Sequence, residues 1–220
     1  MIQKVFFKNN KNLIDIIGIN EQMEPPQRII IGISGASGVI YGIRALELLS
    51  NTSIETHLVV SRSAEITIGY EVETKLTKIK ELANVNHAVN NIGSSISSGS
   101  FKTIGMLILP CSIRTMSEIA TGVTGSLLTR AADVVLKERR QLVLAIRETP
   151  LHTGHLRTMT SLSEMGAIIS PIVPAFYNKP TSIDDIVNHS VGRLLDLFGI
   201  DVGVVKRWKD NNKNTVDARK

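Results

Sequence analysis

The chain has 220 residues and a mass of 24.1 kDa, which is enough for one domain with a substantial buried core. With 43% hydrophobic and 20% charged residues it does not have the composition of a disordered chain, and its longest apolar runs are far too short to cross a bilayer. The single cysteine excludes an internal disulfide framework, and the five histidines show no zinc-type spacing.

The net charge of +5 raises the question of a nucleic-acid partner. One group of basic residues lies in the polar segment 206–220, and the other alternates with apolar residues between Arg130 and Arg147. Aromatic residues make up only 4% of the chain, which leaves little for base stacking. A small phosphorylated ligand explains the second group at least as well. Because the first residues also lack a secretory pattern, we predict a cytoplasmic protein with no nucleic-acid and no membrane partner.

Residues 1–27 are predicted to be an N-terminal extension, residues 28–205 one domain and residues 206–220 a polar C-terminal tail. Apolar runs that end in turn residues predict buried strands at 29–31, 56–60, 106–109, 141–146 and 167–169. Helical spacing predicts helices at 39–50, 62–70, 127–139, 156–165 and 183–197. Ser61 is expected to cap the helix at 62–70, and Ser112 is expected to cap a further helix. Strands that alternate with helices are typical of parallel βαβ units. We therefore predict an α/β fold, a three-layer, doubly wound and mostly parallel sheet.

Ligands of such sheets bind beyond the carboxyl ends of the strands. The first of these ends is a glycine-rich turn, Gly32-Ile33-Ser34-Gly35-Ala36-Ser37-Gly38, which leads from a strand into a helix. Glycines allow backbone N–H groups to approach an anion at the helix N-terminus, and the hydroxyls of Ser34 and Ser37 can bond a phosphate or the edge of a ring. The spacing is not the dinucleotide G-x-G-x-x-G pattern, and a tight turn without a ligand is the alternative.

The third and fourth strand ends also carry polar residues. Ser112 and Thr115 are three residues apart and can face one anion, although simple helix capping is the alternative. Arg147 and Glu148 place a cation beside a carboxylate that can exchange a proton, with a surface ion pair as the alternative. We interpret Cys111 as a buried structural thiol, because no nearby residue supplies a base.

Other polar residues are less informative one by one. Arg130, Asp133 and Lys137 share one face of a predicted helix, where an intrahelical Asp133–Lys137 ion pair is the simple alternative. Tyr177 and Arg193 carry no signal of their own, and His152 and His155 have no third metal ligand in view.

Taken together these segments resemble the UbiX-type flavin prenyltransferase family. The stretches that carry the resemblance are GISGASGVIYGIRAL (32–46), SISSGSF (95–101), PCSIRT (110–115), LLTRAADVVLKERR (127–140), RETPLHTGHLRTM (147–159) and PAFYNKP (174–180). The resemblance implies a Rossmann-like flavoprotein that joins the dimethylallyl group of dimethylallyl phosphate to N5 and C6 of reduced FMN. Phosphate is released, and the prenylated FMN serves a partner UbiD-type decarboxylase.

The resemblance also implies residue roles. FMN is expected to lie across Gly35, Ala36, Ser37, Ser61, Ser112, Ile113, Arg114, Thr115 and Arg147. Dimethylallyl phosphate is expected at Lys137, Glu148, Tyr177 and Arg193, with Arg130 nearby. Glu71 matches a second acidic position near the flavin, Ser98-Gly99-Ser100 a prenyl pocket, and Trp208 a residue that reaches a neighbouring subunit. The family forms homo-oligomers, often dodecamers, with sites between subunits.

The chemistry requires Lys137 and Arg193 to converge with Glu148 on the leaving phosphate, against the flavin. Tyr177 donates a hydrogen bond, and Glu148 is the expected general acid and later proton acceptor. Ring closure removes a flavin proton, through either Ser37 with Glu71 or Glu148 with the released phosphate. No Asp-rich motif is present, so we predict a metal-independent reaction.

Two alternatives stay open, an FMN-dependent cysteine decarboxylase of related fold and a non-catalytic FMN carrier. The sequence also leaves open the choice between a phosphate and a diphosphate donor. The partner decarboxylase is not identified, nor is the pathway, which is either quinone synthesis, as in ubiquinone biosynthesis, or aromatic acid breakdown.

Overall fold

The computed structural model describes residues 26–208, and the remainder of the predicted extension and tail lies outside this range. One sheet contains six strands in the order β3-β2-β1-β4-β5-β6, and every pair of neighbours is parallel. The strands are β1 (Arg28–Ile33), β2 (Glu55–Val60), β3 (Val85–His87), β4 (Gly105–Cys111), β5 (Gln141–Ile146) and β6 (Ile168–Ile169).

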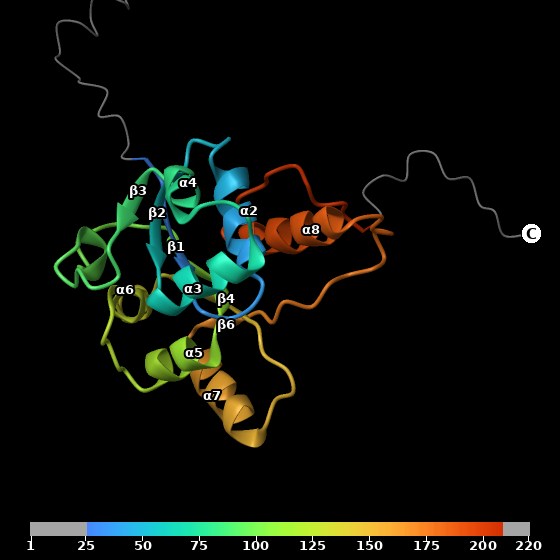
Figure 1. Cartoon of the computed structure of the whole chain (residues 1–220). Helices are drawn as coiled ribbons and strands as arrows, with labels where there is room; N and C mark the ends of the chain where they lie inside the picture. The colour runs from blue at the N-terminus through green and yellow to red at the C-terminus, as the bar shows by residue number, and fades with distance from the viewer. Residues whose placement is uncertain (1–25, 209–220) are drawn as a thin grey trace, which may run out of the picture.

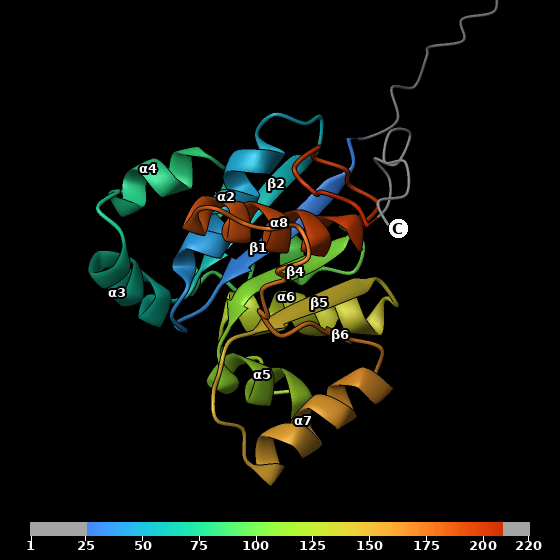
Figure 2. The same ribbon diagram turned by 90° about the vertical axis from the view of Figure 1, so that its right-hand side faces the viewer.

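Helices cover both faces of this sheet, which confirms the predicted three-layer α/β fold. Figure 2 shows α2 and α8 on one side of the strands, and α5 and α7 on the other (compare Figure 1). The first face is covered by α2 (Val39–Leu49), α3 (Arg62–Glu71), α4 (Leu76–Glu81) and α8 (Ile183–Asp196). The second face is covered by α5 (Ile113–Ala120), α6 (Leu127–Lys137), α7 (Thr153–Glu164) and the 3-10 turn η1 (Ser95–Ser97).

The isoleucine run of β1 shows why the sheet is buried on both sides. Ile29 and Ile31 pack into the core under α2 and α8, whereas Ile30 packs into the core under α6, and each is at most 1% exposed. Burial of one such side chain stabilises the fold by about 1.5–3 kcal/mol. A strand that alternates between two cores is apolar at every position, as the sequence pattern predicted.

The structure differs from the predicted elements mainly at the sheet edge. The short edge strand β3 and helix α4 were not predicted, because Val85-Asn86-His87 has too few apolar residues to give a strand pattern. Helix α7 begins three residues earlier than predicted, since His152 caps it. Helix α6 ends at Lys137, because Arg139 has a φ of 57°, outside the right-handed helical region. No helix of residues 26–208 has both the length and the apolar character that crossing a bilayer requires.

Candidate functional site

A cleft of about 370 Å³ opens at the carboxyl edge of the sheet, where the N-termini of α3, α5 and α6 meet. Helix N-termini carry partial positive charge and unpaired N–H groups, so three of them around one cleft favour an anionic ligand. The lining residues are Ser61, Arg62, Ser63, Val89, Asn90, Arg114, Thr115, Glu118, Gly125, Ser126 and Leu128.

Serine side chains begin each of these helices. The hydroxyl oxygens of Ser61, Ser112 and Ser126 accept the backbone N–H groups of the third residue of α3, α5 and α6, at 3.1, 3.3 and 3.3 Å. The prediction that Ser61 and Ser112 are N-caps is therefore confirmed. The Ser112 hydroxyl also donates its own hydrogen to Oγ1 of Thr115 at 3.2 Å. The N–H groups of the first helical turns that the serines do not cap are therefore the feature of the cleft that fits a phosphate-bearing cofactor such as FMN.

The glycine-rich turn lies at the same edge, but its helix N-terminus already holds an anion. Glu71, at the end of α3, accepts the backbone N–H groups of Gly38 and Val39 at 2.8 and 3.0 Å. The N–H groups of Gly38 and Val39 are therefore already bonded to Glu71, and the predicted flavin contacts of this turn fall on the preceding residues, Gly35, Ala36 and Ser37. Burial raises the pKa of Glu71, but hydrogen bonds from Ser37 and the two amides, with the positive charge of Arg147, outweigh burial and hold this pKa below its usual value.

Ser34 has a structural part at this edge rather than a ligand-binding one. It is fully buried, and its hydroxyl donates to the carbonyl of Pro110 at 2.9 Å and accepts the backbone N–H of Ser112 at 2.7 Å. These bonds tie the end of β1 to the end of β4. Ser34 therefore has no hydrogen-bonding capacity left for a phosphate, contrary to the expectation from sequence.

Two glycines of the turn are required by geometry. Gly38 has a φ of 96°, in the left-handed region that favours glycine. A Cβ at Gly35 would overlap the side chain of Ser63, so the turn packs directly against the start of α3. Ser37, between them, is exposed and hydrogen-bonded to Glu71.

Arg147 and Glu148 follow β5 at this edge as predicted. The backbone N–H of Arg147 donates to the carbonyl of Cys111 at 3.1 Å, which places the two strand ends together. Glu148 is exposed and accepts the backbone N–H of Thr149 at 3.0 Å. No ion pair joins Arg147 to Glu148, so the predicted alternative of a surface pair between them is wrong.

Lys137 lies at the opposite edge of the sheet from Glu148. Lys137 ends α6 and precedes β5, whereas Glu148 follows β5, and the strand spans six residues. At about 3.3 Å per residue, the two edges are roughly 20 Å apart. Lys137 donates to Glu138 at 2.6 Å, and a Cβ at Gly99 would meet both side chains, so the segment 98–100 also lies at this distant edge.

The other two cations predicted to bind the donor, Arg130 and Arg193, each form an ion pair within their own helix. Arg130 pairs with Asp133 at 3.0 Å, so the suggested Asp133–Lys137 pair is wrong. Arg193 lies on α8, on the opposite face of the sheet from Lys137, and pairs with Asp196 at 2.6 Å. Within one chain the expected convergence of Lys137 and Arg193 with Glu148 therefore does not occur.

Tyr177 belongs to the α8 side of the molecule. Its hydroxyl lies 3.0 Å from Nε2 of His189, and the Trp208 ring packs edge-on at 5.3 Å between centroids. Tyr177, Arg193 and Trp208 thus form one group, and the structure places Ser37, Glu71 and Arg147 in another.

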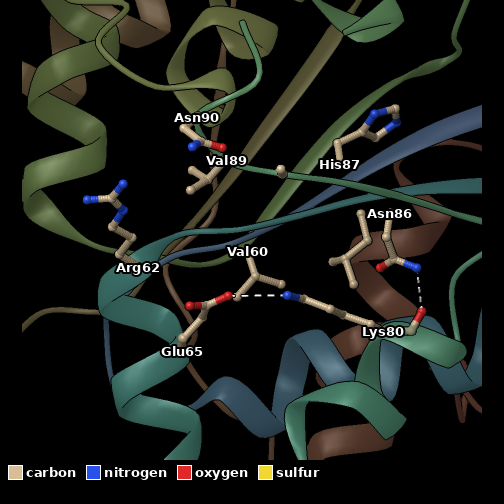
Figure 3. Close-up of a pocket in the computed structure, with 10 residues that line it drawn as sticks. Val60, Arg62, Glu65, Lys80, Asn86, His87, Val89 and Asn90 are labelled. Carbon is tan, nitrogen blue, oxygen red and sulfur yellow. Dashed lines mark hydrogen bonds and ion pairs between the residues drawn. The ribbon is translucent and has the colours of Figure 1, made fainter.

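A smaller pocket of about 190 Å³ adjoins the cleft and shares Arg62, Val89 and Asn90 with it. Figure 3 shows its lining residues, among which Glu65 and Lys80 form an ion pair. The Lys80 nitrogen lies 3.2 Å from the Glu65 carboxylate. The sequence did not predict this smaller pocket, because part of its lining comes from the unpredicted strand β3. It also missed Ser63 and Ser126, although a serine directly before the strongest predicted helix was a usable signal.

The interpretation of Cys111 as a buried structural thiol is confirmed. Cys111 is fully buried, and burial raises its pKa far above the usual value, so it is an inert thiol. The ring nitrogen Nδ1 of His152 accepts the backbone N–H of Gly154 at 3.0 Å and caps α7. Between residues 26 and 208 no group of three or more His, Cys, Asp or Glu side chains is arranged to hold a metal ion.

The sequence and the fold both match known proteins. The family model described as Flavoprotein matches residues 17–195. The flavin prenyltransferase UbiX of Escherichia coli K12 is 56% identical over 186 residues, which cover 83% of this chain and 98% of that protein. The enzyme of the same name from Thauera aromatica is 53% identical, with 84% and 96% covered.

Solved structures of similar proteins have the same fold as this chain. AnUbiX (PadA1), crystallised with FMN and dimethylallyl pyrophosphate, is 46% identical with a TM-score of 0.83, covering 84% of this chain and 98% of its own. The dodecameric FMN-dependent Ubix-like decarboxylase from E. coli O157:H7 is 44% identical with a TM-score of 0.81, covering 83% and 100%. FMN-dependent cysteine decarboxylases such as SpaF, at 16% identity, share the fold alone. This chain belongs to the UbiX flavin prenyltransferase family.

Proposed function

We propose that this chain transfers the dimethylallyl group of dimethylallyl phosphate to N5 and C6 of reduced FMN and releases phosphate. The observation that carries the proposal is the meeting of the glycine-rich turn, Ser61, the 112–115 segment and Arg147 at one edge of the sheet, beside the anion-favouring cleft. A relative 46% identical to this chain was crystallised with FMN and dimethylallyl pyrophosphate, which supports the assignment.

Each residue at this edge has a part in the proposal. Bound FMN supplies the nucleophilic ring nitrogen that accepts the prenyl carbon. Arg147 and the serine hydroxyls hold the cofactor. Ser37 donates to the ionised Glu71, so the lone pairs of Ser37 are free to take a proton from the flavin side while its own proton moves to Glu71. Glu148 is the general acid for the leaving phosphate.

The donor half of the site needs more than one copy of the chain. Lys137, Arg193 and Glu148 lie at separate edges and faces of one protomer, so only assembly can bring Lys137 to the flavin edge. The dodecameric UbiX-like relative supports such an assembly. We propose a homo-oligomer in which Lys137 and Arg130 of one copy complete the site of another.

The test is to incubate reduced FMN with the protein and dimethylallyl phosphate under anaerobic conditions. The expected product is FMN heavier by one five-carbon unit. A parallel reaction with dimethylallyl pyrophosphate identifies the preferred donor. An FMN carrier would give no mass gain with either donor, and a cysteine decarboxylase would instead release carbon dioxide from a cysteine-terminated peptide.

We further propose that the product serves a UbiD-type decarboxylase in the cytoplasm, with no metal, membrane or nucleic acid involved. The buried thiol of Cys111 is compatible with a reducing compartment. The check is to add the reaction product to a UbiD-type decarboxylase prepared without cofactor. The expected result is restored decarboxylation that unmodified FMN does not give.

A further inference from the structure

His189 lies directly behind Tyr177, although no sequence signal singled it out. The side chain comes from the middle of α8 and is only 5% exposed. Its Nε2 lies 3.0 Å from the hydroxyl of Tyr177, and the two rings meet edge-on at 82° with centroids 5.4 Å apart. A distance of 3.0 Å is that of a hydrogen bond of ordinary strength.

The Tyr177 ring is held from two sides. His189 meets it from α8, and Trp208 meets it edge-on at 89°. The ring itself is 45% exposed, so its hydroxyl is anchored while the residue still reaches the surface. An anchored aromatic side chain of this kind loses little conformational entropy when it binds a ligand.

Burial and the nearby charge of Arg193 favour the neutral form of His189. Burial lowers its pKa below the usual value, and the positive charge of Arg193, one helical turn later, lowers it further, while Asp196 acts in the opposite direction. Asp196 is itself paired with Arg193 and with Arg207. A neutral imidazole carries one N–H, so His189 either donates to Tyr177 or accepts from it.

The direction of this bond decides what Tyr177 can do. If Nε2 accepts the phenolic hydrogen, Tyr177 has no hydrogen left for a ligand. If Nε2–H donates to the phenolic oxygen, the hydrogen of Tyr177 is free for a ligand. Arg193 lies one turn further along α8, and its side chain is half-exposed. A phosphate group takes hydrogen bonds only as an acceptor when it is fully ionised, so it requires the second arrangement.

We propose that His189 is a positioning residue for the prenyl donor, donating Nε2–H to Tyr177 so that the phenolic O–H is directed at the donor's phosphate beside Arg193. This inference rests on the proposed function, in which Tyr177 and Arg193 bind dimethylallyl phosphate. It adds a residue that touches neither substrate and acts through Tyr177 alone.

The test is a double-mutant cycle on the intact oligomer. The variants are Tyr177→Phe, His189→Leu and the double substitution, with His189→Gln as the conservative change, because the glutamine Nε2 is as far from the backbone as the histidine Nε2. The control is Ser190→Ala on the same helix, which removes a hydroxyl bonded only to the carbonyl of Ile186. The readouts are the Kd of dimethylallyl phosphate for the protein with oxidised FMN, kcat/KM with reduced FMN, and the Kd of FMN.

We expect His189→Leu and Tyr177→Phe each to weaken dimethylallyl phosphate binding by about three- to tenfold, the factor that corresponds to one ordinary hydrogen bond. The double variant should be no weaker than Tyr177→Phe, since the two residues act as one unit. His189→Gln should restore most of the loss, and FMN affinity should stay unchanged throughout. A purely structural role of His189 would instead lower FMN affinity and leave the two losses additive.

Three outcomes overturn the inference. Additive losses in the double variant, or a His189→Gln variant as weak as His189→Leu, would show that His189 does not act through Tyr177. If the wild-type protein still binds and converts dimethylallyl phosphate, either of these two results rejects the role of His189 alone. A wild-type protein that binds no dimethylallyl phosphate rejects the proposed function together with it.

Discussion

The Glu71 carboxylate lies 2.8 Å from the backbone nitrogen of Gly38, so a side chain at the end of α3 caps the N-terminus of α2. Gly38 has no side chain with which to cap its own helix. The negative charge of Glu71 therefore sits where the helix dipole is most positive. Because Ser37 also donates to Glu71, the same carboxylate stabilises the turn and faces the proposed flavin.

Replacement of Glu71 by Gln should separate its role as the cap of α2 from its role in the proposed proton path. Glu71→Gln keeps an oxygen that can accept the Gly38 N–H, and loss of the charge at an exposed helix end should cost about 0.3–1 kcal/mol of unfolding free energy. We expect FMN affinity within a few-fold of wild type and a turnover at least tenfold lower, since an amide cannot accept a proton from Ser37. Ser37→Ala combined with Glu71→Gln should be no slower than either single variant. Normal turnover of Glu71→Gln would remove the pair from the proton path.

Glu148→Gln should retain FMN but lose most turnover, because the amide cannot protonate the leaving phosphate. General acid catalysis contributes roughly a hundredfold or more, so a loss of this size in kcat is expected. Flavin fluorescence titration and single-turnover kinetics measure the two effects. Near-normal turnover would exclude Glu148 as the acid.

Lys137→Ala and Glu148→Gln should complement each other in mixed oligomers. The two residues lie at opposite edges of one chain, so each variant alone lacks half of every shared site. Random co-assembly after dissociation should restore about a quarter of the wild-type activity, since that share of sites receives one intact residue from each copy. Mixing without exchange of subunits is the control. If co-assembled samples stay inactive, Lys137 does not complete a neighbour's site.

Removal of metal ions should leave the reaction unchanged. No group of three or more metal-ligating side chains is found in the part of the chain that the structure describes, and in the proposed site arginine and lysine would supply the positive charge. Dialysis against EDTA should not alter the rate of prenyl transfer. A loss that added Mg²⁺ reverses would contradict the metal-free account.

Stability should fall in mild acid because of a histidine pair in which His57 is buried and His87 is partly buried. Nδ1 of His57 lies 2.9 Å from Nε2 of His87, and the outer nitrogens of the pair meet Glu55 and Ser94 at 2.7 and 2.6 Å. Burial, together with the charge of His57, lowers the pKa of His87 below its usual 6.5. The unfolded chain therefore binds this proton at a higher pH than the folded protein does.

The unfolding free energy should consequently drop as the pH falls from about 6.5 towards the lowered pKa of His87, and level off below it. We expect His87→Asn to reduce the drop between pH 7.5 and 5.5, measured by urea unfolding. His189 titrates in the same direction, so part of the drop remains. His152→Asn, at an exposed position where Asn also caps a helix, is the control. An unchanged pH dependence in His87→Asn would contradict the assignment.

The sequence alone determined the fold class and the edge of the sheet at which the ligand is expected. A β-branched apolar run such as 29–31, followed by a glycine-rich turn, indicates a strand buried on both faces. A serine after a strand is a local capping signal, so Ser61 and Ser112 were predictable from neighbours in the chain. The resemblance to the UbiX-type family was also visible in the sequence, because it rests on several short contiguous stretches of residues.

Only the tertiary structure decided how distant side chains meet. Glu71 accepts the N–H groups at the N-terminus of α2, and the Ser34 hydroxyl is fully hydrogen-bonded between the ends of β1 and β4. His189 lies behind Tyr177. None of these contacts can be read from the local spacing of residues. The separation of Lys137 from Glu148 follows from the βαβ connection, because α6 runs back between the parallel strands β4 and β5 and ends where β5 begins. Spacing along a chain reports which residues share an element; which residues share a site depends on how the elements, and the copies of the chain, pack together.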